Sequence, residues 1–243
     1  MTIQGSKAKY AKYIVPILNQ CINDNKITTY VDMCCGGANI IKTIECQNRI
    51  AIDKNPYLIA LWKELQKPDF EFPPFPSRED WDRCKNNIEP REWYIGLVQI
   101  FTSYLARGFG GGYNKQEKQY WGRVHTVQKD LPYITTIDFR NDDFQTMLNF
   151  ENALIYVDPP YEGTKQYDIS KDFPYIKFWE TVRQASVKNW VFVSEQHAPN
   201  DFVSIWSLNT ARQLQGNITA CTEHLFIYNK GLAAKYYKID NEV

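Results

Sequence analysis

Five short and almost continuously apolar segments, separated by segments of helical periodicity, constrain the fold of this 243-residue chain more than any other feature. The expected strands cover residues 28–33, 49–53, 153–158, 190–194 and 223–230. Strands that are apolar at nearly every position are typical of sheets covered on both faces. Helical patterns lie between them, at about 7–23, 38–47, 56–66, 90–106 and 174–187. This alternation predicts an α/β fold with a doubly wound, mostly parallel sheet and right-handed crossovers.

The segment between residues 67 and 147 interrupts the alternation. It begins with "KPDFEFPPFPSRED" (67–80), whose four prolines favour an extended connector. Strand signals are weak over the rest, and "RGFGGGYNK" (107–115) indicates a loop tip or a close backbone approach to a ligand. We therefore expect one domain built from residues 1–66 and 148–243, with 67–147 as a small inserted lobe.

Three of the expected strands end at or next to an aspartate: Asp32, Asp53 and Asp158. Ligands of open parallel sheets bind outside the carboxyl ends of the strands. Any one of these acids could instead cap the next helix, but the three together indicate a ligand site. Asp53 follows a glycine turn by about twenty residues, the spacing of the acid that binds ribose hydroxyls in dinucleotide-binding folds. The alternative for Asp53 is the N-cap of the helix that begins near Pro56.

The glycine turn lies in "VDMCCGGANI" (31–40), with Gly36 and Gly37 between an expected strand and an expected helix. Backbone N–H groups at such a helix start can bind a nucleotide-like ligand, although a plain turn gives the same pattern. The residues that follow nearly complete a P-loop, which would indicate an NTPase. That motif needs glycine where this chain has Ile41, and a β-branched residue resists the positive φ that glycine permits.

The strand "ALIYVD" (153–158) runs directly into two prolines and Tyr161. Proline disfavours helix for the residue before it and has no N–H. We therefore expect the chain to leave this strand as a stiff, extended turn. The acid and the carbonyl groups of the turn can accept hydrogen bonds, and Tyr161 adds a flat apolar face. Two acceptors beside an aromatic plane suit the exocyclic amine of a stacked base. A simple strand-ending turn is the alternative.

The tetrapeptide Asp158-Pro159-Pro160-Tyr161 matches the Asp-Pro-Pro-Tyr motif of DNA N6-adenine methyltransferases that use S-adenosylmethionine. The order of the motifs resembles the Dam-like class (class alpha) of these enzymes. Segment 5–14 is similar to the N-terminal cofactor motif of the class, and 31–40 is similar to its glycine motif. Segment 51–59 resembles the part with the ribose-binding acid, and 192–202 resembles the strand and loop after the catalytic motif.

The resemblance implies a Rossmann-like methyltransferase fold, in which residues 1–66 and 148–243 form the catalytic domain and 67–147 form a target-recognition, DNA-binding lobe. It implies site-specific transfer of a methyl group from S-adenosylmethionine to a flipped-out adenine of double-stranded DNA. Asp158 and the carbonyl of Pro159 would accept the N6 hydrogens, and the base would stack on Tyr161. The cofactor-binding residues expected by resemblance are Ile3, Lys7, Asp32, Cys34, Gly36, Gly37, Asp53 and Asp158. Lys7 would pair either with the cofactor carboxylate or with the neighbourhood of Asp158.

Three positions depart from the motifs of the class. Cys35 stands where an aromatic residue usually precedes the first glycine, and Ala38 stands where a second glycine usually follows it. Ile3 stands where the N-terminal motif usually has an aromatic residue, four positions before its lysine. These changes bear on cofactor affinity, because none of them removes an acceptor or a charged partner.

The lobe contains the candidates for DNA contact. Residues 101–129 carry a net charge of plus four, from five Lys and Arg residues and one Glu, although the whole chain is neutral. Cationic and aromatic residues mixed in this way favour a nucleic-acid surface, and a solvated surface is the alternative. The candidates are Arg107, Tyr113, Lys115, Arg123 and Lys129, with Tyr113 as a side chain that could enter the stack left by a flipped base.

The remaining sequence features are negative. None of the six cysteines forms a Cys-x-x-Cys motif and the three histidines are scattered, so we expect no metal. No apolar run is long enough for a membrane span and the first residues lack a signal-peptide pattern, which predicts a cytoplasmic protein, expected as a monomer. Alternatives left open are methylation of cytosine N4 or of RNA adenine, and a non-catalytic DNA-binding relative. A pairing with a restriction nuclease, in a restriction–modification system, is also open.

Overall fold

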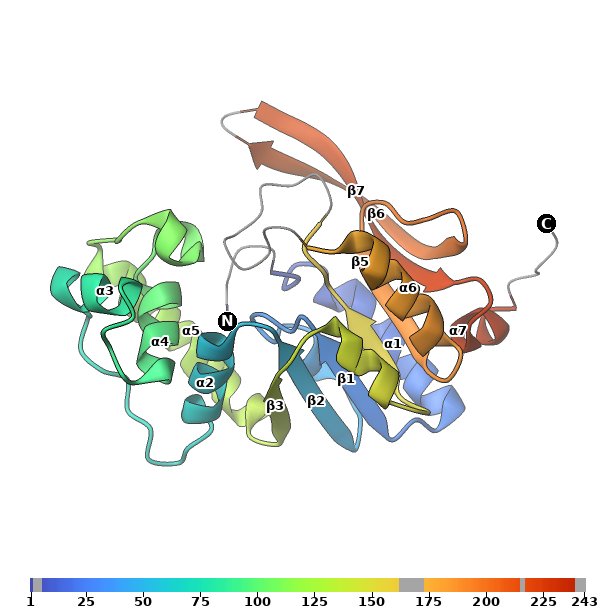
Figure 1. The fold of residues 1–243 in the computed structure, drawn as a ribbon, viewed down its shortest axis with the longest axis horizontal. Coiled ribbons are helices and arrows are strands. Elements are labelled where there is room, and N and C mark those ends of the chain that lie inside the picture. Colours follow the sequence, from blue (N-terminus) through green and yellow to red (C-terminus); the bar gives the residue numbers. More distant parts are fainter. Residues whose placement is uncertain (2–5, 162–172, 215–216, 239–243) are drawn as a thin grey trace.

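The computed structural model describes residue 1 and residues 6–161, 173–214 and 217–238. Seven strands form one sheet in the order β3-β2-β1-β4-β5-β7-β6 (Figure 1). Their bounds are β1 Thr29–Met33, β2 Asn48–Asp53, β3 Ile137–Asn141, β4 Leu154–Val157, β5 Trp190–Glu195, β6 Phe202–Leu214 and β7 Asn217–Tyr228. Strands β1 to β5 pair in parallel, and β7 pairs antiparallel with both β5 and β6. This confirms the predicted Rossmann-like, mostly parallel fold.

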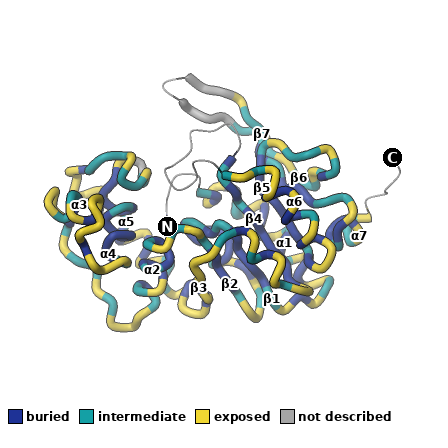
Figure 2. Tube along the Cα trace, viewed as in Figure 1, coloured by how far each residue is buried: buried dark blue, intermediate teal, exposed yellow. Residues whose placement is uncertain are grey.

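Helices cover both faces of the sheet (Figure 1). One apolar core joins the sheet to α1 (Ala11–Asn25), α2 (Pro56–Leu65) and α7 (Leu232–Tyr236). A second core, on the opposite face, joins it to α6 (Tyr175–Ser186) and the 3-10 helix η4 (Phe144–Asn149). The central strands are accordingly buried along most of their length (Figure 2). Burial on both faces explains why these strands are apolar at nearly every position.

Local sequence explains where α2 begins. The Asn55 side chain accepts hydrogen bonds from the N–H groups of Tyr57 (3.1 Å) and Leu58 (3.3 Å), and Pro56 occupies the first helical position. Asparagine at the N-cap followed by proline is a favoured helix start. The alternative role for Asp53, as the N-cap of this helix, is therefore wrong.

The predicted helix over 38–47 is also wrong. The segment is a turn that contains only the short 3-10 helix η1 (Ile41–Thr43). Ala38 has a φ of 53°, in the left-handed region that a helix cannot use. Periodicity alone did not reveal this interruption.

The structure also has two strands that we did not predict, β3 and β6. Because β3 alternates between buried and exposed positions, it lacks a continuous apolar run.

Beside the sheet lie α3 (Arg78–Lys85), α4 (Glu92–Phe101), α5 (Glu117–Ile134) and the 3-10 helices η2 (Tyr104–Ala106) and η3 (Gly108–Gly111). We call this group of helices, with the segment that precedes it, the helical lobe (Figure 1). The proline-rich segment is fixed to it, because Tyr120 and Tyr113 donate hydrogen bonds to the carbonyls of Pro73 (2.6 Å) and Pro76 (2.8 Å). Strand β3 lies within the range 67–147 but belongs to the central sheet.

Candidate active site

The sheet register places the three aspartates on one face, at the carboxyl ends of their strands. Asp32 pairs with Ala51 on β2 and with Tyr156 on β4. Asp53 and Asp158 each follow these partners by two residues, and residues two apart on a strand point to the same face. The three acids therefore project from neighbouring strands toward the side of the sheet that α1 covers. The sequence predicted that the three acids share one edge of the sheet, and the register adds that they share one face.

The glycine turn between β1 and β2 has an unusual backbone. Cys34, Gly36 and Ala38 have φ values of 62°, 48° and 53°. Glycine adopts this left-handed conformation without strain, whereas Cys34 and Ala38 adopt it at a cost of about 1–2 kcal/mol each. A Cβ at Gly37 would lie 2.3 Å from the carbonyl oxygen of Met1, so no larger residue fits there. The turn thus keeps the conformation of a glycine motif even where alanine replaces glycine.

Asp53 and Asp32 hold this turn through backbone N–H groups. Asp53 accepts from Gly36 N (3.0 Å) through Oδ2 and from Asn55 N (2.9 Å) through Oδ1. Asp32 accepts from Ile41 N at 3.2 Å and is 2% exposed. Burial raises the pKa of Asp53, and it raises the pKa of Asp32 well above its usual value. These two carboxylates hold the turn through its backbone N–H groups.

A cluster of four side chains lies at the end of β4. Lys7 Nζ is 2.6 Å from Asp158 Oδ1, 3.6 Å from Glu223 Oε1 and 4.4 Å above the centre of the Tyr161 ring. The Tyr161 hydroxyl donates a hydrogen bond to Glu223. Burial raises the pKa of Asp158 to about 6, against the opposing effect of the Lys7 ammonium. Burial lowers the pKa of Lys7, but the two carboxylates more than offset this and the net direction is upward. We call these four residues the Asp158 cluster.

The Asp-Pro-Pro-Tyr segment continues β4 for one residue and then turns away. Asp158 N donates to the carbonyl of Met33 at 3.2 Å, which extends the parallel ladder. Pro159 is buried, and the carbonyl of Pro160 accepts a hydrogen bond from the Tyr175 hydroxyl at 2.9 Å. Helix and strand thus both end before this segment, and its prolines make no hydrogen bond of the ladder. The segment carries the Asp158 side chain to Lys7.

The structure brings most of the expected site residues to one edge of the sheet. They are Lys7, Asp32, Cys34, Gly36, Gly37, Asp53, Asp158, Pro159, Pro160 and Tyr161. Lys7 pairs with Asp158, which was one of its two expected positions. Ile3 lies outside the described residues. Sequence reasoning missed Glu223; the available signal was a glutamate directly at the start of the expected strand 223–230.

The lobe candidates divide into two groups. Arg123 Nη1 donates to the carbonyls of Ile100, Phe101 and Ser103 at 2.8–2.9 Å, where α4 ends. Tyr113 stacks on Phe75 and bonds to Pro76, so it packs inside the lobe and is not placed to enter a base stack. Arg107, Lys115 and Lys129 are exposed. The structure thus gives two of the five candidates a structural use and leaves three on the surface.

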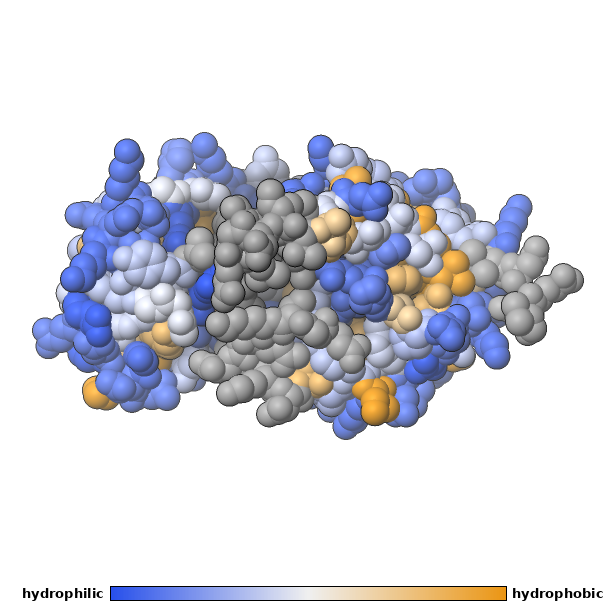
Figure 3. Space-filling model, turned by 90° about the horizontal axis from the view of Figure 1, so that it is seen from above, coloured by the Kyte–Doolittle hydropathy of each residue, from blue (hydrophilic) through white to orange (hydrophobic). Residues whose placement is uncertain are grey.

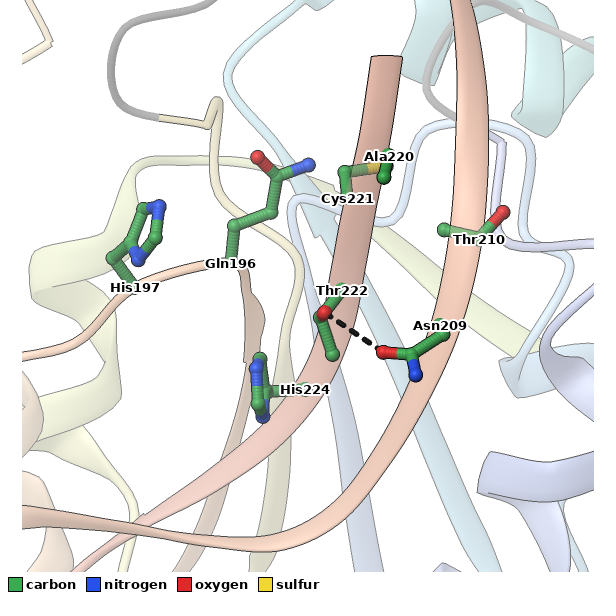
Figure 4. A pocket seen from close by; sticks show the side chains of 8 residues that line it. All are labelled: Gln196, His197, Asn209, Thr210, Ala220, Cys221, Thr222 and His224. Atoms are coloured by element: carbon green, nitrogen blue, oxygen red, sulfur yellow. Dashed lines mark hydrogen bonds between the residues drawn. The ribbon is translucent and has the colours of Figure 1, made fainter. Parts of the chain in front are cut away.

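A cavity of about 380 Å³ lies between the loop after β5 and the β6–β7 ribbon (Figure 4). None of the four residues of the Asp158 cluster is among those that line it. Its lining is amide, hydroxyl, thiol and imidazole, from Gln196, His197, Asn209, Thr210, Ala220, Cys221, Thr222 and His224.

Seen from above, the described surface of the molecule is mainly hydrophilic, with scattered apolar residues (Figure 3).

Within the described residues, no group of three or more His, Cys, Asp or Glu side chains is arranged to hold a metal ion. All six cysteines are free thiols. A search of the described helices finds none with the length and apolarity that crossing a membrane requires.

Two solved structures of known proteins are similar to this chain in fold. TrmN from Thermus thermophilus is 12% identical with a TM-score of 0.36, over 93% of this chain and 52% of TrmN. The rRNA methyltransferase aviRa from Streptomyces viridochromogenes is 10% identical with a TM-score of 0.39, over 91% of this chain and 84% of aviRa. The chain thus spans about half the length of TrmN. No family model and no curated protein matches the sequence. Neither similarity assigns an activity or a substrate to this chain.

Proposed function

We propose that this protein is an S-adenosylmethionine-dependent methyltransferase that methylates the N6 amine of a flipped-out adenine in double-stranded DNA. One observation carries the proposal. The Asp-Pro-Pro-Tyr segment leaves the end of β4 with Asp158 held by Lys7, on the same edge of the sheet as the glycine turn and Asp53. An acceptor, an aromatic face and a nucleotide-type turn are thereby combined in one site.

The residues around the glycine turn suit the cofactor. The tight backbone at Gly37 leaves no room for a side chain, and Gly36 lies beside the Asp53 carboxylate. A carboxylate has about four acceptor positions, and backbone N–H groups use two of those of Asp53, so it can also accept from ribose hydroxyls. Gly36, Gly37 and Asp53 would hold the cofactor, which supplies an activated methyl group when bound.

Asp158, Pro159 and Tyr161 would act on the base. The ionised Asp158 side chain and the Pro159 carbonyl accept the two N6 hydrogens, which keeps the nitrogen lone pair out of conjugation with the ring and directed toward the methyl donor. The base stacks on Tyr161 after leaving the duplex, at a cost of a few kcal/mol. Forming the N–C bond would break the bond between the methyl group and the sulfur of the donor and would leave one proton to be lost from the nitrogen, which the Asp158 carboxylate would accept. Catalysis then comes mainly from position and electrostatics.

The helical lobe supports a nucleic-acid substrate. Arg107, Lys115 and Lys129 are exposed cations, and side chains of this kind hold phosphates. We propose that the lobe within 67–147 recognises the target, that the protein acts as a monomer, and that it works in the cytoplasm. The same site chemistry could serve RNA adenine or cytosine N4, so the test includes both products.

The test uses purified protein, S-adenosylmethionine with a labelled methyl group, and unmethylated DNA or RNA in parallel. Digestion to nucleosides identifies the product. We expect N6-methyldeoxyadenosine, with incorporation lowered by about 10³-fold in Asp158→Ala because an acceptor for the amine is lost. Asp69→Ala, which changes an exposed aspartate, is the control and should stay active. Label in cytosine or only in RNA would replace the proposed substrate, and no label in any nucleic acid would overturn the proposed activity.

A further inference from the structure

A carboxylate from a distant part of the chain reaches the proposed catalytic residues. Glu223 lies on β7, next to His224, which pairs with Glu195 at the carboxyl end of β5. It is 3% exposed, although glutamate is rarely buried unless it is paired. Its partners are the Tyr161 hydroxyl and, at 3.6 Å, Lys7 Nζ. The antiparallel strand β7 therefore delivers this acid to the edge where the parallel strands end.

Charge balance sets Glu223 apart from an ordinary buried ion pair. One ammonium group, that of Lys7, faces two carboxylates, those of Asp158 and Glu223. An ion pair of Lys7 and Asp158 would be balanced without a second acid, and burying an additional charge is costly. The arrangement calls for a reason other than stability.

The contacts of Glu223 suggest what that reason is. Its bond to the Tyr161 hydroxyl anchors the far end of the ring on which the base is proposed to stack. Its attraction for Lys7 holds the ammonium over that ring, 4.4 Å from the centre and still 2.6 Å from Asp158. Both groups that flank the acceptor thus depend on one side chain.

We propose that Glu223 is a positioning residue for methyl transfer: it holds the Tyr161 ring and the Lys7 ammonium where Asp158 needs them. The inference rests on the function proposed above and adds to it a residue outside the Asp-Pro-Pro-Tyr motif. Glu223 acts through Tyr161, Lys7 and Asp158, so it needs no contact with the substrate.

Glu223 also affects the pH dependence of the reaction. Two charged groups act on the pKa of Asp158: Lys7 lowers it and Glu223 raises it. The charge of Asp158 in turn raises the pKa of the other titratable groups that face it, which are Asp32, Cys34, Tyr156 and Tyr161. Burial raises the pKa of Asp158 to about 6, and the charge of Glu223 adds to this rise. Asp158 must be ionised to accept both a hydrogen bond and a proton from the amine. Activity should therefore fall as the pH drops through about 6, and removing the charge of Glu223 should move this acid limb to lower pH.

The experiment measures kcat and KM between about pH 5 and 9 for the wild type, Glu223→Gln and Glu223→Ala. Glutamine keeps an oxygen that accepts from Tyr161 but removes the charge, so we expect the acid limb of kcat/KM, which reports the free enzyme, to move to lower pH. Alanine removes both functions, and we expect kcat to fall by about 10²-fold as the ring and ammonium lose their positions. KM for the cofactor should change little, since the contacts that Glu223 makes are with Tyr161 and Lys7 and not with the glycine turn.

The matched control is Glu89→Gln in the helical lobe. Glu89 is also a buried glutamate, 4% exposed, and pairs with Arg83 and Arg91. Its substitution should lower the melting temperature without moving the acid limb. If Glu223→Gln behaves in the same way, with lower stability and an unmoved limb, Glu223 is structural and the inference is overturned. An inactive wild type on DNA and RNA would instead overturn the proposed function, and with it any role in that reaction.

Discussion

The carboxyl edge of the sheet and the helical lobe use charged residues in opposite ways. At the edge, Asp32, Asp53 and Asp158 point inward and bind backbone N–H groups or Lys7. In the lobe, most charged side chains lie outside, and the interior is built from aromatic rings such as the pair Trp81 and Phe109, whose centroids are 5.0 Å apart. Paired acids therefore characterise the edge, and packed aromatic rings characterise the interior of the lobe.

Backbone strain does not follow the same division. The turn at the edge holds Cys34 and Ala38 in left-handed conformations, and Asn87 and Ala106 adopt them in the helical lobe. Helix α3 begins with the capping box of Ser77 and Asp80, whereas α4 and α5 begin without a side-chain cap. The two regions differ in where their charged side chains lie, and on that ground we expect substitutions at the edge to reduce function and substitutions inside the lobe to reduce stability.

Asp53→Ala should give the largest effect on ligand binding. The variant loses the acceptor for Gly36 N and the proposed acceptor for ribose, and charged hydrogen bonds contribute about 1.5–3 kcal/mol. We expect the affinity for S-adenosylhomocysteine, measured by titration calorimetry, to fall about 10–100-fold. Asp138→Ala, at an exposed position on β3, is the control. An unchanged affinity with a lower melting temperature would show that Asp53 only holds the turn. The edge, like the lobe, would then use this residue for stability and not for ligand binding.

Gly96→Ala should give the largest effect on stability. Helix α4 approaches α2 so closely that a Cβ at Gly96 would lie 2.1 Å from the carbonyl oxygen of Tyr57, a backbone atom that cannot rotate away. We expect the free energy of unfolding, from denaturant titration, to fall by about 1–3 kcal/mol. Gly122→Ala is the matched control, because a Cβ there meets no atom within 4 Å. Replacing glycine by alanine within helix α5 should raise stability by about 0.5–1 kcal/mol. Equal effects of the two substitutions would mean that the lobe is not fixed by this close approach.

The edge could be predicted from the sequence because its signals are local. The ends of the strands determine the edge of the sheet at which Asp32, Asp53 and Asp158 lie, and the prolines determine where the chain leaves β4. Glu223 could not be placed in this way. It comes from a strand that pairs antiparallel with β5, and nothing near it in the sequence states which strand it joins. The partner of this strand is set by the order of the whole sheet and not by the residues around Glu223.

The lobe was harder to predict because composition does not give orientation. Tyr113 and Arg123 lie in a segment rich in cations and aromatic residues, and both face the interior of the lobe. Their hydrogen bonds go to backbone carbonyls of Pro76 and Ile100, which the sequence does not mark as needing partners. The same composition fits a nucleic-acid surface and a packed helical lobe, and only the fold separates the two.

The smallest expected effects concern the exposed cations, and they test whether the lobe has a functional surface at all. Lys115→Ala combined with Lys129→Ala should lower the salt dependence of DNA binding by roughly 0.9 in slope for each phosphate that is no longer neutralised, equally for all sequences. The melting temperature should not change, since both side chains are exposed.

Arg123→Ala is the comparison, because it leaves three carbonyls at the end of α4 without their donor. It should cost about 1–3 kcal/mol of stability and leave the slope unchanged. Binding by fluorescence anisotropy at several salt concentrations separates the two outcomes. If the lysine variant keeps the full slope, Lys115 and Lys129 hold no phosphate, and Arg107 is the one exposed cation left among the five candidates.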